Sequence, residues 1–272
     1  MFELVQRGPI SYLECVPLRE LGFVTHAFCT RREGVSAGAF KSLNFSTSEG
    51  DPEECVRANW DRTAEAFGLS RRQFFNVHQV HGNEVLVIDD PAFRTFTCQP
   101  LRYDAIVTAR PGLALCIRTA DCVPILLADS RKGAVAAVHA GWRGTSLGVA
   151  ARAVDCLREH FASDPRDLLA AVGPSIGPCC YEVDKPVHRS MEALGPDRTS
   201  FLAAVGKGKW KFDLAAENRS QLLERGLSPE RIYLSGACTS CESERWFSHR
   251  RDAGRTGRHL NFIFMDRTPQ IL

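Results

Sequence analysis

The chain lacks the features of a membrane, secreted or nucleic-acid-binding protein. No apolar run approaches the about 20 residues of a membrane-spanning helix, and residues 1–7 lack the basic start and apolar stretch of a signal peptide. The 34 Lys and Arg residues nearly balance the 32 Asp and Glu residues, and a net charge of +2 provides no broad attraction for nucleic acid or lipid. We expect a cytoplasmic protein with no nucleic acid, no membrane and no obligate protein partner.

Cysteine is the residue type that is present in excess. The chain has 11 cysteines, an odd number at irregular spacing, which indicates a reducing compartment and thiols that are buried or bind a ligand. The 272 residues are 44% hydrophobic and 24% charged, as in an ordinary globular protein. No repeat or long linker divides the sequence, so we expect a single domain over residues 1–272.

Strands are predicted in pairs and triplets between single helices. This order favours an α+β fold, with mixed β-sheets between α-helices, over a doubly wound parallel sheet. Helices are predicted from the Asp51-Pro52 cap to Phe67, over Gly144–Phe161, and from Asp213 to near Gly226. Strands are predicted at Phe23–Cys29, Asn76–Val80, Glu84–Ile88, Ala105–Thr108, Leu113–Ile117, Val123–Ala128, Ala134–His139, Leu168–Val172, Ile232–Leu234 and Leu260–Phe264.

Three residues are candidates for one metal centre. Cys122 follows an acid in Thr-Ala-Asp-Cys, His139 ends an apolar strand in His-Ala-Gly-Trp-Arg-Gly, and His81 precedes a glycine in Gln-Val-His-Gly. Two imidazoles and a thiolate can hold zinc and leave its fourth position open, as in catalytic sites. His78 lies three residues before His81, so on a strand it would point to the opposite face, and we expect it to pack beside the site.

A second cysteine group competes with this centre. Cys238 and Cys241 have the short spacing of a structural zinc site and could bind an ion together with Cys179 and Cys180. The adjacency of Cys179 and Cys180 argues against this alternative, because neighbouring side chains seldom reach one tetrahedral ion. A redox role for Cys238 and Cys241 has less support, since no thioredoxin-like unit surrounds them.

Six groups of motifs stand out along the chain: His26–Arg31 with Gly34–Ser36 and Ser42–Asn44; Gln79–Gly82; Asp104-Ala with Thr119–Pro124; His139–Gly144; Gly173–Pro178 with Cys180–Val183; and Cys238-Thr with Phe247–Asp252 and Thr256–Arg258. Together they resemble the YfiH family, which is described both as a multicopper polyphenol oxidase or laccase domain and as a purine nucleoside phosphorylase. The resemblance implies a single α+β domain and a zinc ion held by His81, Cys122 and His139. Copper is the less favoured metal.

The family resemblance implies phosphorolysis of purine nucleosides (adenosine, inosine, guanosine and methylthioadenosine) with adenosine deamination as a second activity. The expected small-molecule partners are therefore a nucleoside and phosphate. We expect Arg143, with Arg31, to hold phosphate and Asn44 to hold a polar group of the substrate. Asp121, Cys122 and His139 are the candidate catalytic residues, Asp121 as a carboxylate beside the metal or a proton carrier. Asp121 could equally shape a turn.

Two further functions compete with phosphorolysis. A His₂Cys set also suits a copper centre, although only eight histidines and three methionines are present for a multicopper oxidase. A metal-free Cys122–His139 pair could instead act as a nucleophile and base, in a hydrolase or amidase that edits peptidoglycan precursors. Metal content separates the zinc enzyme from the metal-free hydrolase, because a bound ion occupies the Cys122 thiolate and prevents it from acting as a nucleophile.

Overall fold

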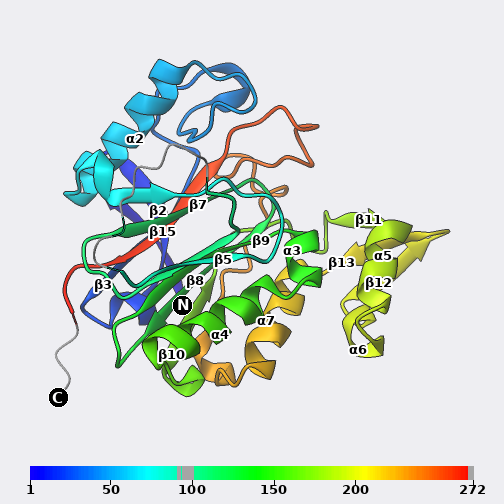
Figure 1. Ribbon diagram of the computed structural model, residues 1–272. Helices are drawn as coiled ribbons and strands as arrows, with labels where there is room; N and C mark the ends of the chain where they lie inside the picture. Colours follow the sequence, from blue (N-terminus) through cyan, green and yellow to red (C-terminus); the bar gives the residue numbers. More distant parts are fainter. Residues whose placement is uncertain (91–92, 94–100, 269–272) are drawn as a thin grey trace.

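Two six-stranded mixed sheets lie face to face at the centre of the protein, and helices cover their outer faces (Figure 1). The computed structural model describes residues 1–90, 93 and 101–268. The predicted α+β class, with mixed sheets between helices, is confirmed. Among the described residues, no helix is long and apolar enough to cross a membrane.

The first sheet has the strand order β1-β2-β3-β15-β7-β4, with only β4 and β7 parallel. The second has the order β14-β10-β8-β9-β6-β5 and contains two parallel pairs, β10 with β14 and β5 with β6. The strands of the first are β1 (Phe2–Arg7), β2 (Ile10–Cys15), β3 (Val24–Cys29), β15 (His259–Met265), β7 (Ala114–Thr119) and β4 (Phe74–Asn76); those of the second are β14 (Ile232–Leu234), β10 (Leu168–Val172), β8 (Val123–Asp129), β9 (Val135–Ala140), β6 (Ala105–Thr108) and β5 (Val85–Ile88).

Helix α2 covers the first sheet and helices α4 and α7 cover the second, while a small sheet with α5 and α6 projects to one side (Figure 1). The projecting sheet has the order β11-β13-β12. Its strands are β11 (Glu182–Asp184), β13 (Lys209–Phe212) and β12 (Leu202–Gly206), and the helices are α1 (Val16–Arg19), α2 (Glu53–Phe67), α3 (Trp142–Ser146), α4 (Val149–Phe161), α5 (Lys185–Glu192), α6 (Pro196–Thr199) and α7 (Leu214–Glu224), with 3₁₀ turns η1 (Gly38–Phe40), η2 (Arg71–Gln73), η3 (Pro165–Asp167) and η4 (Pro229–Arg231).

Strand β8 shows how one strand serves two hydrophobic layers. Its side chains alternate, so that Ile125 and Leu127 pack toward α4 and α7 while Leu126 and Ala128 pack between the sheets. All seven residues of β8 are buried. A strand covered on both faces carries a nearly continuous apolar run, which is why the sequence pattern identified it.

Several predicted boundaries are wrong for identifiable reasons. The strand predicted at Asn76–Val80 lies instead at Phe74–Asn76, and the chain beyond it turns toward the carboxylate of Asp104. The predicted helix Gly144–Phe161 is two helices, since Gly148 has a left-handed φ of 76° between them. Asp51 does not cap α2; its carboxylate instead accepts hydrogen bonds from Ser36 and Asn44.

Strands β1 and β2 were not predicted. β1 is an edge strand in which partly buried and exposed side chains mix without a clean apolar face, so it carries no period-two signal. The segment from Tyr181 to Lys209, which shows no clear pattern, holds most of the projecting sheet and both of its helices.

Candidate metal centre and adjoining cavity

The register of the second sheet brings the predicted ligands to one end of its strands. Val123 of β8 pairs with Ala140 of β9, so Cys122, just before β8, lies beside the end of β9, which carries His139. The turn that contains His81 leads into β5 at the same end of the strands. Strand pairing therefore joins three residues that are as much as 58 positions apart in the chain.

The three candidate ligands converge. Their ligand atoms, two imidazole nitrogens and the Cys122 sulfur, lie within 4.8 Å of one another, and the rings of His81 and His139 stand 4.8 Å apart at 70°. Gly141 makes this close approach possible, because a Cβ there would lie 2.8 Å from His81 Nδ1 and 3.0 Å from Cys122 Sγ. His78 does not join the group; it is exposed and lines the cavity described below rather than packing beside the site.

Asp104 organises two of the ligands. Its buried carboxylate accepts hydrogen bonds from the backbone N–H groups of Val80, His81 and Gly82, at 3.2, 2.9 and 2.6 Å. The same carboxylate is 2.8 Å from His139 Nδ1. Because Nδ1 is engaged in this way, Nε2 of His139 is the ring nitrogen available to a metal, as in carboxylate–histidine–zinc arrangements.

The charges of the group favour a thiolate. Burial alone raises the pKa of Cys122, but the nearby His139 and His81 lower it to about 6. The opposite holds for His139: burial lowers its pKa, and the Cys122 thiolate and Asp104 raise it to about 9. A thiolate held beside two imidazoles is the form that binds zinc, and it is also the form that acts as a nucleophile.

The candidate metal centre opens into a cavity of about 610 Å³ whose walls are strongly basic. Among the described residues, neither Arg118 nor Arg143 has an acidic partner within 4.0 Å. Burial and the neighbouring Arg258 lower the pKa of Arg118, so an anion in the cavity would relieve the repulsion between these cations. The lining residues include the arginines Arg118, Arg143, Arg250 and Arg258, the hydroxyl residues Ser46, Thr47 and Ser48, and the aromatic residues Trp142 and Tyr181.

Asp121 lines the same cavity, but both oxygens of its carboxylate are engaged. Oδ1 accepts a hydrogen bond from the Thr239 hydroxyl at 2.6 Å, and Oδ2 accepts one from the backbone N–H of Arg250 at 2.7 Å. Its backbone has a φ of 88°, and its carbonyl accepts from Ile176 N–H. Asp121 thus joins three loops around the cavity.

Arg31 and Asn44 do not line the cavity. Arg31 donates to the carbonyls of Lys41 and Ser243 and lies 4.5 Å over the Phe247 ring. Asn44 is fully buried. Its amide nitrogen donates a hydrogen bond to the Ser46 carbonyl, and its amide oxygen accepts one from the backbone N–H of Arg258. The structure brings His81, Cys122, His139, Asp121 and Arg143 together around the cavity. Arg31 and Asn44 lie outside its lining.

Sequence reasoning missed the arginines that come from distant segments and the role of Asp104. Asp104 offered one signal, since a carboxylate directly before a mostly apolar strand is costly to bury without partners. Arg118 and Arg258 offered no such signal, because β7 and the segment before β15 meet only through strand pairing.

The alternative cysteine group is also assembled, which corrects the argument made from adjacency. The sulfurs of Cys179, Cys180, Cys238 and Cys241 lie within 4.8 Å of one another. Cys179 and Cys180 occupy a turn rather than a strand, closed by hydrogen bonds from Cys180 and Tyr181 N–H to the Gly177 carbonyl. In a tight turn, successive side chains need not point to opposite sides, so both can face one centre.

Comparison with known proteins places this geometry in a family. Residues 25–266 match the family model described as "Multi-copper polyphenol oxidoreductase laccase". "Purine nucleoside phosphorylase YlmD" of Geobacillus stearothermophilus is 37% identical over 97% of both chains, and "Purine nucleoside phosphorylase" of Deinococcus radiodurans is 39% identical over 90% of both. The crystal structure of the Bacillus licheniformis hypothetical protein YfiH superposes with a TM-score of 0.88 at 33% identity, covering 97% of this chain and 98% of that one. The chain therefore belongs to the YfiH, or laccase-domain, family, as its motifs predicted.

Proposed function

We propose that the protein is a zinc-dependent purine nucleoside phosphorylase. The observation that carries the proposal is the meeting of a His₂Cys donor set with a basic cavity large enough for a nucleoside and phosphate. The names of the Geobacillus and Deinococcus relatives support the same reaction class. Adenosine, inosine, guanosine and methylthioadenosine are the proposed substrates, with adenosine deamination as a second activity.

The arginines supply the anion-binding half of the reaction. Phosphorolysis brings a phosphate oxygen to the ribose C1′ while the bond from C1′ to the purine nitrogen breaks. Phosphate must be held close to the nucleoside against its hydration, and an arginine without an acidic partner suits that task. We assign phosphate binding to Arg143, with Arg118 as a second cation, and base contacts to the aromatic side chains of Trp142 and Tyr181.

The donor set fits zinc. Two imidazoles and a thiolate are three protein ligands of the kind found in catalytic zinc sites, and a bound zinc ion would supply Lewis-acid activation at its open position. Asp104 holds the ring of His139 through Nδ1 and the His81 turn through backbone N–H groups. Asp121 acts as a positioning residue for Arg250, and Asn44 does the same for Arg258 through the backbone. Arg31 supports the Phe247 loop.

The test combines elemental analysis with a phosphate-dependence assay. Protein expressed without added metal should contain zinc, and adenosine and inosine should yield the free base and ribose 1-phosphate only when phosphate is present. The Cys122→Ser variant should lose both zinc from this centre and the reaction. Base release that is independent of phosphate would remove the phosphorylase proposal.

A second candidate function rests on one specific contact. The 2.8 Å link from Asp104 to His139, with Cys122 adjacent, has the arrangement of a Cys-His-Asp hydrolase triad. The hydrolase or amidase proposal, including peptidoglycan precursor editing, predicts activity in metal-free protein that one equivalent of zinc inhibits. The zinc proposal predicts the opposite: metal-free protein should be inactive, and one equivalent of zinc should restore activity.

Copper oxidase chemistry is the third candidate and has the weakest structural support. In the described part of the chain, the His81–Cys122–His139 group is the only cluster of three or more metal donors that contains histidine, whereas multicopper oxidation needs several copper sites. Met191 and Met265 are buried in hydrophobic cores away from this group, so neither offers an axial thioether. Strong blue absorbance of copper-loaded protein would favour this candidate over the zinc enzyme.

A further inference from the structure

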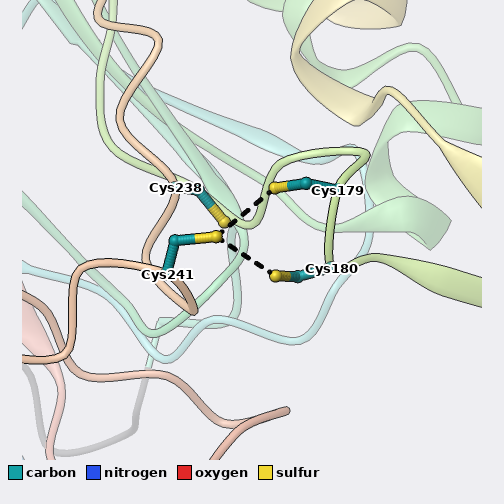
Figure 2. A group of neighbouring side chains, drawn as sticks. All are labelled: Cys179, Cys180, Cys238 and Cys241. Atoms are coloured by element: carbon teal, nitrogen blue, oxygen red, sulfur yellow. Dashed lines mark hydrogen bonds between the residues drawn. The ribbon is translucent and has the colours of Figure 1, made fainter.

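Four cysteines form a second group of metal donors apart from the proposed active site. Cys179 and Cys180 belong to the turn after β10, and Cys238 and Cys241 belong to the loop after β14. Figure 2 shows their side chains pointing toward one another from the two loops. Cys241 Sγ lies 3.6 Å from Cys179 Sγ and 3.4 Å from Cys180 Sγ.

These separations have the size of a single four-thiolate site. A zinc–sulfur bond of about 2.3 Å in a regular tetrahedron places neighbouring sulfurs about 3.8 Å apart. The two sulfur pairs at 3.4 and 3.6 Å fall close to that edge, and no pair of sulfurs in the group exceeds 4.8 Å. Four sulfurs so arranged leave room for one ion. A disulfide would use two of them and leave the other two without a role.

The backbone around the group is built to stabilise a charged sulfur. The N–H group of Gly177 donates to Cys238 Sγ at 3.2 Å. Gly177 packs closely against the group, since a Cβ there would lie 3.3 Å from Cys179 Sγ, a tight contact, and 3.5 Å from Cys238 Sγ, an ordinary one. Backbone donors to cysteine sulfur are the outer contacts that orient ligands and moderate their charge in metal sites.

We propose that Cys179, Cys180, Cys238 and Cys241 bind one structural zinc ion that fastens two cavity loops together. A tetrahedral set of four thiolates selects zinc among the common divalent ions. The two loops are already joined by the bond from Thr239 N–H to the Ser175 carbonyl, 3.0 Å long. They also carry Ile176 and Tyr181 on one side and His249 and Arg250 on the other, all of which line the cavity.

Metal counting tests the proposal on the full-length protein without using activity. Wild-type protein should hold about two zinc ions per chain, one in each donor group. Cys179→Ser/Cys241→Ser and His81→Ala/Cys122→Ser should each hold about one, since each pair removes a different site. Cys55→Ser, a partly exposed cysteine in the first turn of α2, is the matched control and should retain the wild-type zinc content.

Zinc X-ray absorption decides the ligands with all four cysteines intact. In the His81→Ala/Cys122→Ser protein, the remaining zinc should show four sulfur neighbours at about 2.3 Å. This measurement does not depend on whether a cysteine-cluster variant folds. Fewer sulfur neighbours, bound iron in place of zinc, or a disulfide among the four cysteines found by mass spectrometry would overturn the proposal. The outcome is independent of the phosphorylase assay, so either proposal can fail alone.

Discussion

Asp104 holds two of the candidate ligands in place at the candidate active site. One buried carboxylate satisfies three successive backbone N–H groups and one imidazole, and it thereby holds His81 and His139 in one arrangement. A carboxylate can be buried at such a position only because these donors replace the water that it loses. The left-handed φ of 60° at His81 belongs to the same turn around the carboxylate.

The interaction of Asp104 with His139, and of His139 with Cys122, predicts an unusual pH dependence of Cys122 reactivity. In metal-stripped protein, alkylation of Cys122 should rise through a midpoint near pH 6, well below the ordinary cysteine value of 9.0, because the thiolate is the reactive form. Asp104→Asn should shift the midpoint upward, since a neutral amide supports the His139 charge less well. The rate is followed by mass spectrometry of iodoacetamide-treated protein. A midpoint above pH 8 in the wild type would contradict the prediction, and added zinc should protect the thiol.

Arg143 carries the prediction for phosphate. Arg143→Ala should raise the KM for phosphate by about 10- to 100-fold, the range for losing hydrogen bonds to a charged group, with a smaller change in the KM for nucleoside. Arg152→Ala is the matched control, because Arg152 lies on α4 with its side chain half exposed and paired with Glu159. Steady-state kinetics with varied phosphate decide the matter. An unchanged phosphate KM would remove Arg143 from the anion site.

At the scale of elements, the site depends on how the chain leaves β9 and enters α3. Gly141 occupies that junction, and the space that its missing side chain leaves is filled by His81 and Cys122. The local sequence pattern predicts one long helix here, whereas Gly148 divides it into α3 and α4. The break directs α3 toward the cavity, where Trp142 and Arg143 line the wall.

Gly141→Ala should therefore weaken zinc binding at the His–Cys–His centre. The added Cβ would come within 3.0 Å of two ligands, so at least one must move, and we expect a loss of affinity of about tenfold or more. Gly206→Ala in β12 is the control, because a Cβ there meets nothing within 4 Å. Zinc affinity is measured by competition with a chelator of known strength. Equal affinities for the two variants would contradict this role of Gly141.

For the whole molecule, two buried histidines link stability to pH. His26 Nε2 accepts a hydrogen bond from Cys15 N–H, and His259 Nε2 accepts one from Phe247 N–H. Burial lowers the pKa of each from 6.5 to about 3, so both stay neutral in the folded protein. The unfolded chain binds more protons between those pH values, and stability must fall as the pH is lowered through this window.

His26→Gln should flatten that dependence. Between pH 6 and pH 4 the wild type should lose about 1.4 kcal/mol per pH unit more than the variant does, because one proton-uptake site is removed from the unfolded state. Urea denaturation at several pH values measures the two slopes, and the carboxylates contribute equally to both proteins. Parallel slopes would show that His26 is not held neutral in the folded state.

The amino-acid sequence by itself determined the fold class, the family and the three candidate ligands of the His–Cys–His group. Strands such as β8 are buried on both faces and carry apolar runs that need no tertiary information to recognise. The glycine-flanked motifs that hold His81 and His139 are likewise local, because each sets the backbone around its own ligand.

Only the tertiary structure decided which distant groups meet. Asp104 reaches His139 through the pairing of β6 with β9, Arg118 reaches the cavity through β7, and two loops bring four cysteine sulfurs to one point. Such meetings depend on strand register and on the direction of side chains in turns, and neither quantity is encoded by the spacing of residues along the chain.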